Sequence, residues 1–328
     1  MNSKTKVLVA GLGSIGLRHA RLLSEREDIE LSICEMTEEN RKNAVSVLSG
    51  TKLAAYRDLA DALREKPDVV FVCVPDKFHV PVGMQAIESG ADIFVEKPVS
   101  DSIEPAKSLV TAAGKLKKFM QVGYMLRLDE GLQKMKLVVE NSGLGNLVGG
   151  RAMIGTYITL LNAKSNDREV NRNSLIVDYT HELDFIRWFF GNVIEVKAMG
   201  SSTGAMEKRP EPNIVQMLLK MQNGALVQVH MDYIQFPQRR LFEVYGDKGT
   251  LSYDFMTGEI KRFHLQKEHA WEDMSVIPIM ERWNDLFRKE HEIFFNRRRE
   301  GIPPLVSGDD ALQVLELAKK AIEAMGKA

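Results

Sequence analysis

The sequence predicts an α/β protein in which a doubly wound parallel sheet is followed by an α+β domain on a largely antiparallel, open-faced sheet. Three observations support this. The first third alternates uninterrupted apolar runs with helical patterns, whereas after Gly123 the apolar residues recur at every second position. The chain has 328 residues, which is more than one typical core accommodates. We therefore expect two domains, residues 1–123 and 124–328.

The elements of the first domain follow from its apolar periods. Runs that are apolar at successive positions are typical of strands buried on both faces, as in a parallel sheet covered by helices. These runs are Val7–Ala10, Leu31–Cys34, Val69–Val74, Ile93–Val95 and Phe119–Val122. The segments between them have apolar residues three and four positions apart: Ser14–Arg26, Glu38–Leu48, Val80–Ser89 and Ile103–Leu116. This alternation of strands and helices predicts a doubly wound sheet.

The second domain begins with a different pattern. The strands Val215–Met221 and Ala225–Tyr233 alternate apolar and polar residues across Asn223-Gly224, which predicts a hairpin. Shorter apolar runs at Leu241–Tyr245 and Leu251–Tyr253 extend the sheet, and helical patterns at Met280–Arg298 and Asp309–Met325 end the chain. One face of such a sheet packs on a core and the other stays open. A second copy of the chain is the common cover, so we expect a homodimer or homotetramer.

Composition limits the partners of the protein. The formal net charge is −1, which gives no electrostatic reason to expect nucleic acid or an anionic membrane. No stretch approaches the length of a membrane span, and residues 1–6 lead directly into the first strand without a signal-peptide pattern. The two cysteines, Cys34 and Cys73, lie in apolar runs, as expected for buried thiols in a reducing compartment. We expect a cytoplasmic protein.

The first strand leads into the turn Gly11-Leu12-Gly13-Ser14-Ile15-Gly16, and Glu35 closes the next apolar run. Gly11 permits the tight turn, Gly13 lets a pyrophosphate approach the backbone, and Gly16 lets the helix pack on the strand. The pyrophosphate would lie on the N-terminal amides of the helix, next to Ser14 and Ile15. Together with the flanking periods, this pattern predicts a dinucleotide site. The alternative is a glycine turn with no ligand.

Polar residues follow two further strands at the edge where such sheets bind ligands. Val74-Pro75 ends one strand and is followed by His79, which either braces its loop or lies near the cofactor. Glu96-Lys97-Pro98 ends the next strand. Pro98 biases Lys97 towards an extended conformation, which directs its ammonium group away from a helix.

These motifs together resemble the glucose–fructose oxidoreductase/inositol dehydrogenase family, often called Gfo/Idh/MocA. The resemblance extends over nearly the whole chain. Gly123-Tyr124-x-x-Arg127 is similar to the crossover segment of that family. Asp178-Tyr179-Thr180-His181-Glu182-Leu183-Asp184 is similar to its substrate motif, and Val306-Ser307-Gly308-Asp309 to the start of its terminal helix.

The resemblance implies an NAD(P)-dependent oxidoreductase that acts on a secondary alcohol or ketone of a sugar, polyol or sugar derivative, nucleotide sugars included. Lys97 and His181 would be the catalytic pair, with Asp178 beside them. Val74, Pro75, His79, Glu96 and Lys97 would complete the cofactor site. Tyr124, Arg127, Arg172, Asp178 and His181 would contact a small carbohydrate substrate. The chemistry agrees with the residue types, because imidazole transfers protons near neutral pH and an ammonium stabilises a developing alkoxide.

Three departures from the family pattern concern the substrate. Asn171-Arg172-Asn173-Ser174 replaces a glycine run, so Arg172 would meet an anionic substrate group. Asp178 lies three residues before His181 instead of four, and Val177 occupies the usual place. Met125 stands where a polar residue is common.

Glu35 favours NAD, because a carboxylate accepts hydrogen bonds from ribose hydroxyls and repels a 2′-phosphate. Arg41 leaves NADP open as an alternative. We expect no metal, since His264 and His269 have no evident third ligand and hydride transfer needs none.

Three other interpretations remain open. Without Lys97 and the family resemblance, His181 would be interpreted as a buried, hydrogen-bonded histidine. The whole chain would suit a glycosidase that oxidises and re-reduces its sugar through NAD without net redox change. It would also suit a non-catalytic NAD(P)-binding regulator.

Overall fold

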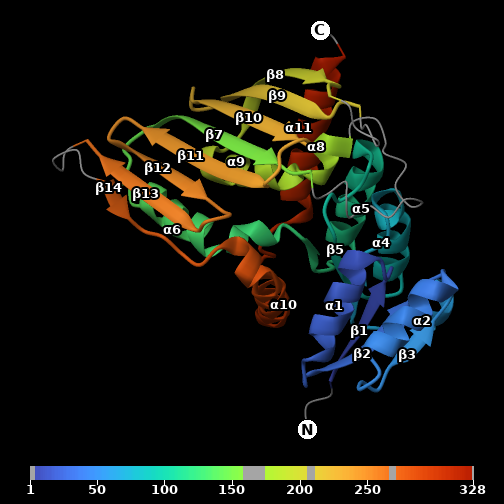
Figure 1. Ribbon diagram of the computed structural model, residues 1–328. Helices are drawn as coiled ribbons and strands as arrows, with labels where there is room; N and C mark the ends of the chain where they lie inside the picture. Colours follow the sequence, from blue (N-terminus) through green and yellow to red (C-terminus); the bar gives the residue numbers. More distant parts are fainter. Residues whose placement is uncertain (1–3, 158–173, 205–210, 266–270, 327–328) are drawn as a thin grey trace. The chain divides into compact units, whose positions relative to one another are not determined.

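A computed structural model describes residues 4–157, 174–204, 211–265 and 271–326. The chain divides into two compact units (Figure 1). The first comprises residues 1–125 and 284–315, and the second comprises residues 126–283 and 316–328. No helix in these described ranges is long and apolar enough to cross a membrane.

The first unit is built on a six-stranded parallel sheet with the strand order β3-β2-β1-β4-β5-β6. Its strands are β1 (Thr5–Ala10), β2 (Ile29–Cys34), β3 (Ala54–Tyr56), β4 (Val69–Val72), β5 (Asp92–Val95) and β6 (Met120–Val122). Its helices are α1 (Ser14–Ser24), α2 (Glu38–Val47), α3 (Leu59–Arg64), α4 (His79–Glu88), α5 (Ile103–Lys115) and most of α10 (Trp283–Glu300), with the short η1 (Asp76–Phe78). The doubly wound parallel sheet is therefore confirmed.

Helix α10 packs on this first sheet although it lies near the end of the chain. Phe294 and Phe295 belong to the same buried cluster as Val9 and Phe71. Arg298 near the end of α10 makes a 2.7 Å ion pair with Asp92 at the start of β5. The first unit ends at residue 125, close to the boundary expected at residue 123, and it also includes residues 284–315, because the aromatic face of α10 is buried with it.

The second unit is built on an eight-stranded sheet with the strand order β14-β13-β12-β11-β7-β10-β9-β8. Its strands are β7 (Leu147–Gly155), β8 (Val193–Ser201), β9 (Ile214–Met221), β10 (Leu226–Asp232), β11 (Arg239–Gly246), β12 (Gly249–Asp254), β13 (Glu259–His264) and β14 (Trp271–Asp273). Adjacent strands are antiparallel except β10 and β7, which are parallel. The expected α+β domain on a largely antiparallel sheet is confirmed.

Helices cover one face of this sheet, as Figure 1 shows for α6 and α9. The helical segments of this unit are η2 (Met125–Leu128), α6 (Glu130–Glu140), α8 (Ser174–Asp178), α9 (Thr180–Phe190), η3 (Ile279–Arg282) and the part of α11 (Gly308–Met325) from residue 316 onward. Phe185 and Phe189 of α9 contact Phe242 of β11, with ring centroids 4.7 and 5.0 Å apart. Burial of these rings holds α9 on the sheet.

The predicted hairpin forms as expected. Strands β9 and β10 pair Leu219 with Val227 and Met217 with Val229, and the turn residue Gly224 has a φ of +88°. That φ favours glycine, because a side chain would be strained there. The buried residues of both strands face the helices.

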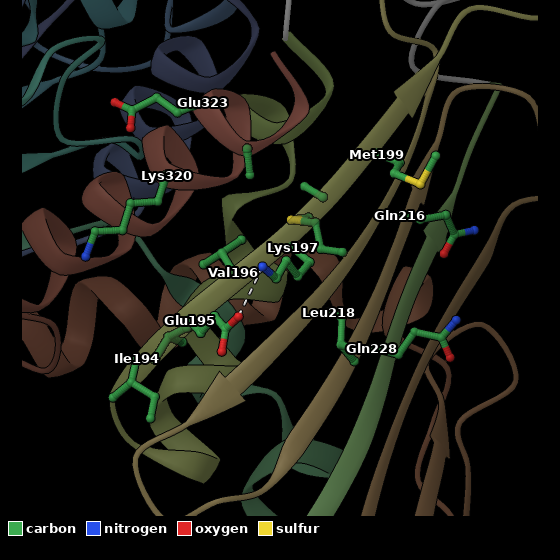
Figure 2. A pocket seen from close by; sticks show the side chains of 14 residues that line it. Ile194, Glu195, Val196, Lys197, Met199, Gln216, Leu218, Gln228, Lys320 and Glu323 are labelled. Atoms are coloured by element: carbon green, nitrogen blue, oxygen red, sulfur yellow. Dashed lines mark ion pairs between the residues drawn. The ribbon is translucent and has the colours of Figure 1, made fainter. Parts of the chain in front are cut away.

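The other face of the sheet is open and more apolar than alternation predicts. Figure 2 shows residues that line a pocket at the edge strand β8, among them Lys320 and Glu323 of α11, and the ion pair between Glu195 and Lys197. Met199 of β8 is 70% exposed, and Leu218 and Leu226 of the neighbouring strands are 45% and 49% exposed. This face is therefore mixed instead of polar.

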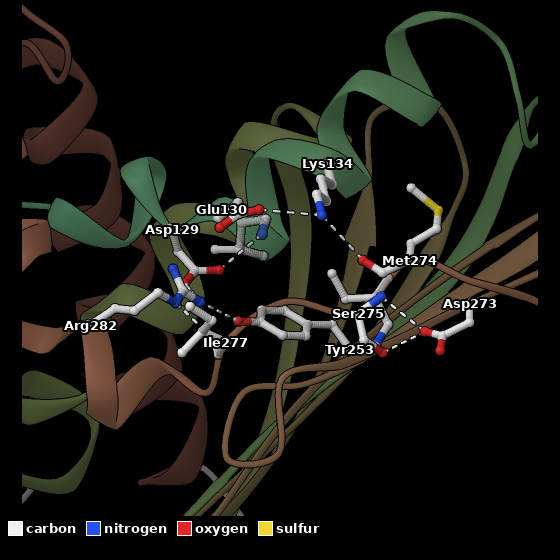
Figure 3. Close-up of polar contacts among 11 residues, drawn as sticks. Asp129, Glu130, Lys134, Tyr253, Asp273, Met274, Ser275, Ile277 and Arg282 are labelled. Atoms are coloured by element: carbon white, nitrogen blue, oxygen red, sulfur yellow. Dashed lines mark hydrogen bonds and ion pairs between the residues drawn. The ribbon is translucent and has the colours of Figure 1, made fainter.

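A polar cluster fixes the N-terminus of α6 to the sheet (Figure 3). Asp129 caps the helix through a 3.0 Å hydrogen bond from the Leu132 amide and makes a 3.1 Å ion pair with Arg282. The ring of Tyr253 lies directly against Gly131, where an added Cβ would be 2.4 Å from the ring. The absence of a side chain at Gly131 thus allows α6 to approach β12.

Candidate active site

The glycine-rich turn lies at the carboxyl end of β1, the strand on whose two sides the chain winds in opposite directions. Gly11 has a φ of +89°, and a Cβ there would be 2.6 Å from the Val74 nitrogen. A Cβ on Gly16 would be 1.9 Å from the Gly11 carbonyl oxygen. Both positions therefore require glycine. A Cβ on Gly13 would meet nothing within 4 Å, so this part of the turn is open.

The N-terminus of α1 fits a pyrophosphate. Gly13 precedes the helix without a side-chain cap, and the first turn contains no acidic residue. Ser14 and Ile15 are exposed there. Amides at a helix N-terminus that no side chain caps attract an anion through hydrogen bonds and the helix dipole. The residues present therefore suit a dinucleotide.

Glu35 connects the end of β2 to this turn. Its Oε2 accepts a 2.8 Å hydrogen bond from the Leu12 amide, and its Oε1 accepts one of 2.8 Å from the Thr37 amide. Arg41 of α2 donates from Nη1 to the Glu35 carbonyl oxygen at 2.7 Å. The two amides orient the carboxylate, and each oxygen keeps a further lone pair for a ribose hydroxyl.

Val74 and Pro75 follow β4, which ends at Val72 and so is two residues shorter than the sequence predicted. His79 begins α4 and is 2% exposed. Its Nδ1 lies 2.8 Å from the Pro98 carbonyl oxygen and its Nε2 lies 2.7 Å from that of Val74. Burial lowers the pKa of the His79 ring, and the hydrogen bonds to the two carbonyls partly offset this shift. The ring connects two loops at the edge of the sheet.

Glu96 and Lys97 lie directly beyond β5, at the same edge of the sheet as the glycine turn. Glu96 accepts hydrogen bonds from His19 at 2.8 Å and from the Lys97 amide at 3.1 Å. Burial would raise the pKa of the Glu96 carboxyl, but the hydrogen bond and charge of His19 and the charge of Lys97 outweigh it and lower the pKa. An ionised Glu96 therefore stands next to Lys97.

The second unit contains Asp178 and His181. Asp178 ends α8, and its Oδ2 accepts a 2.6 Å hydrogen bond from the Tyr233 hydroxyl, which follows β10. Burial and the adjacent Asp178 charge raise the pKa of the Tyr233 phenol, so Tyr233 remains a hydrogen-bond donor. His181 lies in the first turn of α9 and is 8% exposed.

Two buried ion pairs hold α9 in place around His181. Arg240 of β11 donates from Nε to Glu182 at 2.7 Å. Arg127 makes a two-point contact with Asp184, from Nε at 3.0 Å and from Nη2 at 2.7 Å. Hydrogen bonds between a planar guanidinium group and a carboxylate are stronger than hydrogen bonds between neutral groups. Arg127, predicted from the sequence to contact substrate, orients the helix that carries His181 through this contact.

Tyr124 is fully buried, at 0% exposure, in the first unit. Arg172 lies outside the described residues. Lys97 belongs to the first unit and His181 and Asp178 to the second.

Three further residues were not predicted from the sequence: His19 and His291 in the first unit and Tyr233 in the second. His19 is the polar exception on the buried face of α1, which is the signal that would have found it. Alternation along residues 225–233 places Tyr233 on the apolar side of the strand and does not reveal its contact with Asp178. His291 makes a 2.7 Å contact with His19 from α10, across 272 residues of sequence, which no local pattern reveals.

Comparison with known proteins agrees with this fold. A family model described as an oxidoreductase family with an NAD-binding Rossmann fold matches residues 5–124, and its C-terminal alpha/beta domain matches residues 164–327. The protein is therefore an oxidoreductase with an NAD-binding fold. It belongs to the Gfo/Idh/MocA family.

Among individual relatives, inositol 2-dehydrogenase of Corynebacterium glutamicum (strain R) is 29% identical over 256 residues, which cover 76% of this chain and 73% of that protein. Myo-inositol 2-dehydrogenase of Thermotoga maritima is 26% identical over 97% of this chain and 96% of that protein. The crystal structure of myo-inositol 2-dehydrogenase from Lactobacillus plantarum superposes with a TM-score of 0.83 at 22% identity, over 99% and 98% of the two chains.

Proposed function

We propose that the protein is an NAD-dependent dehydrogenase that oxidises a secondary alcohol of a sugar, polyol or sugar derivative, nucleotide sugars included. Lys97, His181 and Asp178 carry the reaction. The observation that supports this most directly is Lys97 beside the ionised Glu96, at the strand edge that also carries the glycine turn. The two inositol dehydrogenases among the relatives support a polyol as the substrate class.

The reaction removes a hydride from the carbinol carbon and a proton from its hydroxyl. Bound NAD+ supplies the hydride acceptor. His181 takes the proton, because an imidazole changes its charge near neutral pH. The Lys97 ammonium stabilises the negative charge that develops on the oxygen. Asp178, oriented by Tyr233, binds a substrate hydroxyl or the His181 ring.

The test is to incubate the purified protein with NAD+ and a panel of inositols, monosaccharides and nucleotide sugars, and to follow absorbance of the reduced nicotinamide. Turnover is expected with at least one polyol or sugar. Lys97→Ala and His181→Ala should each abolish it while NADH still binds, as measured by its fluorescence. A fully active double variant would contradict the proposed roles.

The same panel separates the two alternatives. A glycosidase with no net redox change would release the aglycone from an aryl glycoside without accumulating NADH. A non-catalytic regulator would bind NADH and turn over nothing. The exposed, uncapped turn at Gly13 fits cofactor binding in all three cases, so binding alone does not decide between them.

We also propose NAD over NADP as the preferred cofactor. The Glu35 carboxylate, held by the Leu12 and Thr37 amides, would repel a 2′-phosphate at the end of β2. Arg41 is the residue through which NADP would be accommodated. Its Nη1 donates a hydrogen bond to the backbone carbonyl oxygen of Glu35. The positively charged Arg41 side chain and the negatively charged Glu35 side chain therefore both lie at the end of β2.

For the assembly, we propose a homodimer or homotetramer formed through the open face of the eight-stranded sheet. Met199, Leu218 and Leu226 expose apolar side chains on this unit. Light scattering at micromolar concentration tests this, and a monomer would contradict it.

The compartment we propose is the cytoplasm, since Cys34 and Cys73 are both free thiols and burial raises the pKa of each.

A further inference from the structure

Two buried histidines flank the Glu96-Lys97-Pro98 segment. His19 contacts the residue before Lys97, and His79 contacts the residue after it. They come from different helices, α1 and α4, and both belong to the first unit. Neither contact was apparent from the sequence.

The His19 ring is fixed on all sides. It is 0% exposed and lies among the rings of Phe71, Phe94 and Phe287, with centroids 5.5, 5.3 and 5.1 Å away. Its Nε2 is 2.8 Å from Glu96 Oε1, and its Nδ1 is 2.7 Å from Nε2 of His291. A ring held this firmly transmits its position to the carboxylate it contacts.

The ionised Glu96 carboxylate determines which nitrogen of the His19 ring carries a hydrogen. An ionised carboxylate only accepts, so Nε2 of His19 carries a hydrogen whether the ring is neutral or charged. Glu96 Oε2 in turn accepts from the Lys97 amide at 3.1 Å. A Cβ on Gly123 would be 3.1 Å from Glu96 Oε1, so glycine at this position avoids a close contact with the carboxylate.

On the other side of Lys97, His79 is 2% exposed and its Nδ1 is 2.8 Å from the Pro98 carbonyl oxygen. Its Nε2 faces the Val74 carbonyl oxygen at 2.7 Å. Only the Nδ1 contact reaches the segment that contains Lys97. The two ring nitrogens therefore have separable effects.

We propose that His19 and His79 are positioning residues that fix the backbone on either side of Lys97 and so direct its ammonium group. This inference rests on the proposed role of Lys97. Displacement of a catalytic group by about 1 Å costs on the order of 100-fold in rate. Loss of either contact should therefore lower kcat more than it changes KM.

Asparagine and glutamine test each contact separately, because the Asn amide nitrogen lies close to the place of Nδ1 and the Gln amide nitrogen close to that of Nε2. His19→Gln keeps the donor to Glu96, whereas His19→Asn loses it. His79→Asn keeps the donor to Pro98, whereas His79→Gln loses it. The substitution that keeps the contact is therefore Gln at position 19 and Asn at position 79.

The expected result follows this reversal. With NAD+ and myo-inositol as the probe, kcat should be about tenfold or more lower in His19→Asn than in His19→Gln, and in His79→Gln than in His79→Asn. KM for myo-inositol should differ less than kcat within each pair. Thermal unfolding should be similar within a pair, since each variant loses one contact of the buried ring. If the same substitution, Asn or Gln, gave the lower kcat at both positions, the proposal would be overturned.

A second readout does not depend on turnover. Reductive methylation with 13C-formaldehyde labels lysines, and the Lys97 signal is the one absent from Lys97→Arg. That signal should be shifted or broadened in His19→Asn and His79→Gln relative to their partners. An unchanged signal in all four variants would overturn the proposal.

The two readouts also separate this proposal from the proposed function. If Lys97→Ala is fully active but the signal follows the reversed order, the catalytic role of Lys97 fails while the positioning stands. If His19 variants do not fold, the His79 pair alone decides.

Discussion

The Tyr233 hydroxyl donates a 2.6 Å hydrogen bond to Oδ2 of Asp178. Tyr233 is 1% exposed and also lies 3.5 Å from the Ser174 hydroxyl, so its ring is fixed on the end of β10. The hydrogen bond from Tyr233 orients the Asp178 carboxylate from the side of the sheet.

Tyr233→Phe should therefore lower kcat by about 10- to 100-fold, since hydrogen bonds to charged groups contribute about 1.5–3 kcal/mol. The phenylalanine ring keeps the packing against Tyr179, whose ring centroid is 5.7 Å away. Steady-state kinetics with the active polyol provide the measurement.

Tyr245→Phe is the matched control. Tyr245 also donates to a carboxylate, Glu243, at 2.8 Å on the same sheet, but it lies outside the candidate site. Its substitution should leave kcat within about twofold of the wild type. Equal losses in both variants would assign Tyr233 a structural role only.

The fold could be predicted largely because its strongest patterns are local. The apolar runs at Val7–Ala10 and Ile93–Val95 and the Asn223-Gly224 turn each determine an element by themselves. Strand β3 was missed because three residues at a sheet edge carry no period, and β7 because Gly149 and Gly150 interrupt its alternation.

The candidate site could be predicted only in part, for the same reason. The glycine turn and Glu35 lie in one βαβ unit, where spacing reflects geometry. The contacts of Glu96 with His19 and of Asp178 with Tyr233 join residues 77 and 55 positions apart. Such pairs depend on which helix and strand faces pack together in the folded protein. Periodicity in the sequence shows which face of each element is apolar, but not which other element it packs against.

Glu35→Ser should relax the preference for NAD. Serine removes the charge that repels a 2′-phosphate, and Arg41 would then face the phosphate alone. NADH should bind about tenfold more weakly and NADPH more tightly, as measured by fluorescence titration. Unchanged affinities for both cofactors would show that Glu35 does not select between them.

Gly131→Ala should destabilise the second unit. An alanine Cβ would lie 2.4 Å from the Tyr253 ring, and overpacking of this kind costs about 1–3 kcal/mol of unfolding free energy. The measurement is the unfolding temperature by calorimetry. Helix propensity alone would predict the opposite, a gain of about 1 kcal/mol.

Gly114→Ala is the control for that prediction. Gly114 lies in α5 and a Cβ there would meet nothing within 4 Å, so only helix propensity acts. This variant should be stabilised or unchanged. A stabilised Gly131→Ala would mean that Tyr253 moves aside without cost.

Glu290 should make the protein less stable as the pH rises. Both carboxyl oxygens are buried without a hydrogen-bond partner among the described residues, and burial together with the nearby Glu96 charge raises the pKa of Glu290 well above its ordinary value. In the unfolded chain the carboxyl ionises near its ordinary pKa of about 4.3. Its contribution to stability is therefore complete below that pH and is lost as the pH rises towards the folded pKa.

Glu290→Gln removes this ionisation and keeps the shape of the side chain. As the pH rises above about 4.3 towards the raised pKa of Glu290, the variant should lose less stability than the wild type, by up to about 1.4 kcal/mol for each pH unit. Denaturant unfolding at several pH values measures the difference. Glu292→Gln on the same helix is the control, because Glu292 is exposed and its replacement should leave the pH dependence unchanged. If Glu290→Gln and the wild type have parallel pH profiles, the pKa of Glu290 is not raised by folding.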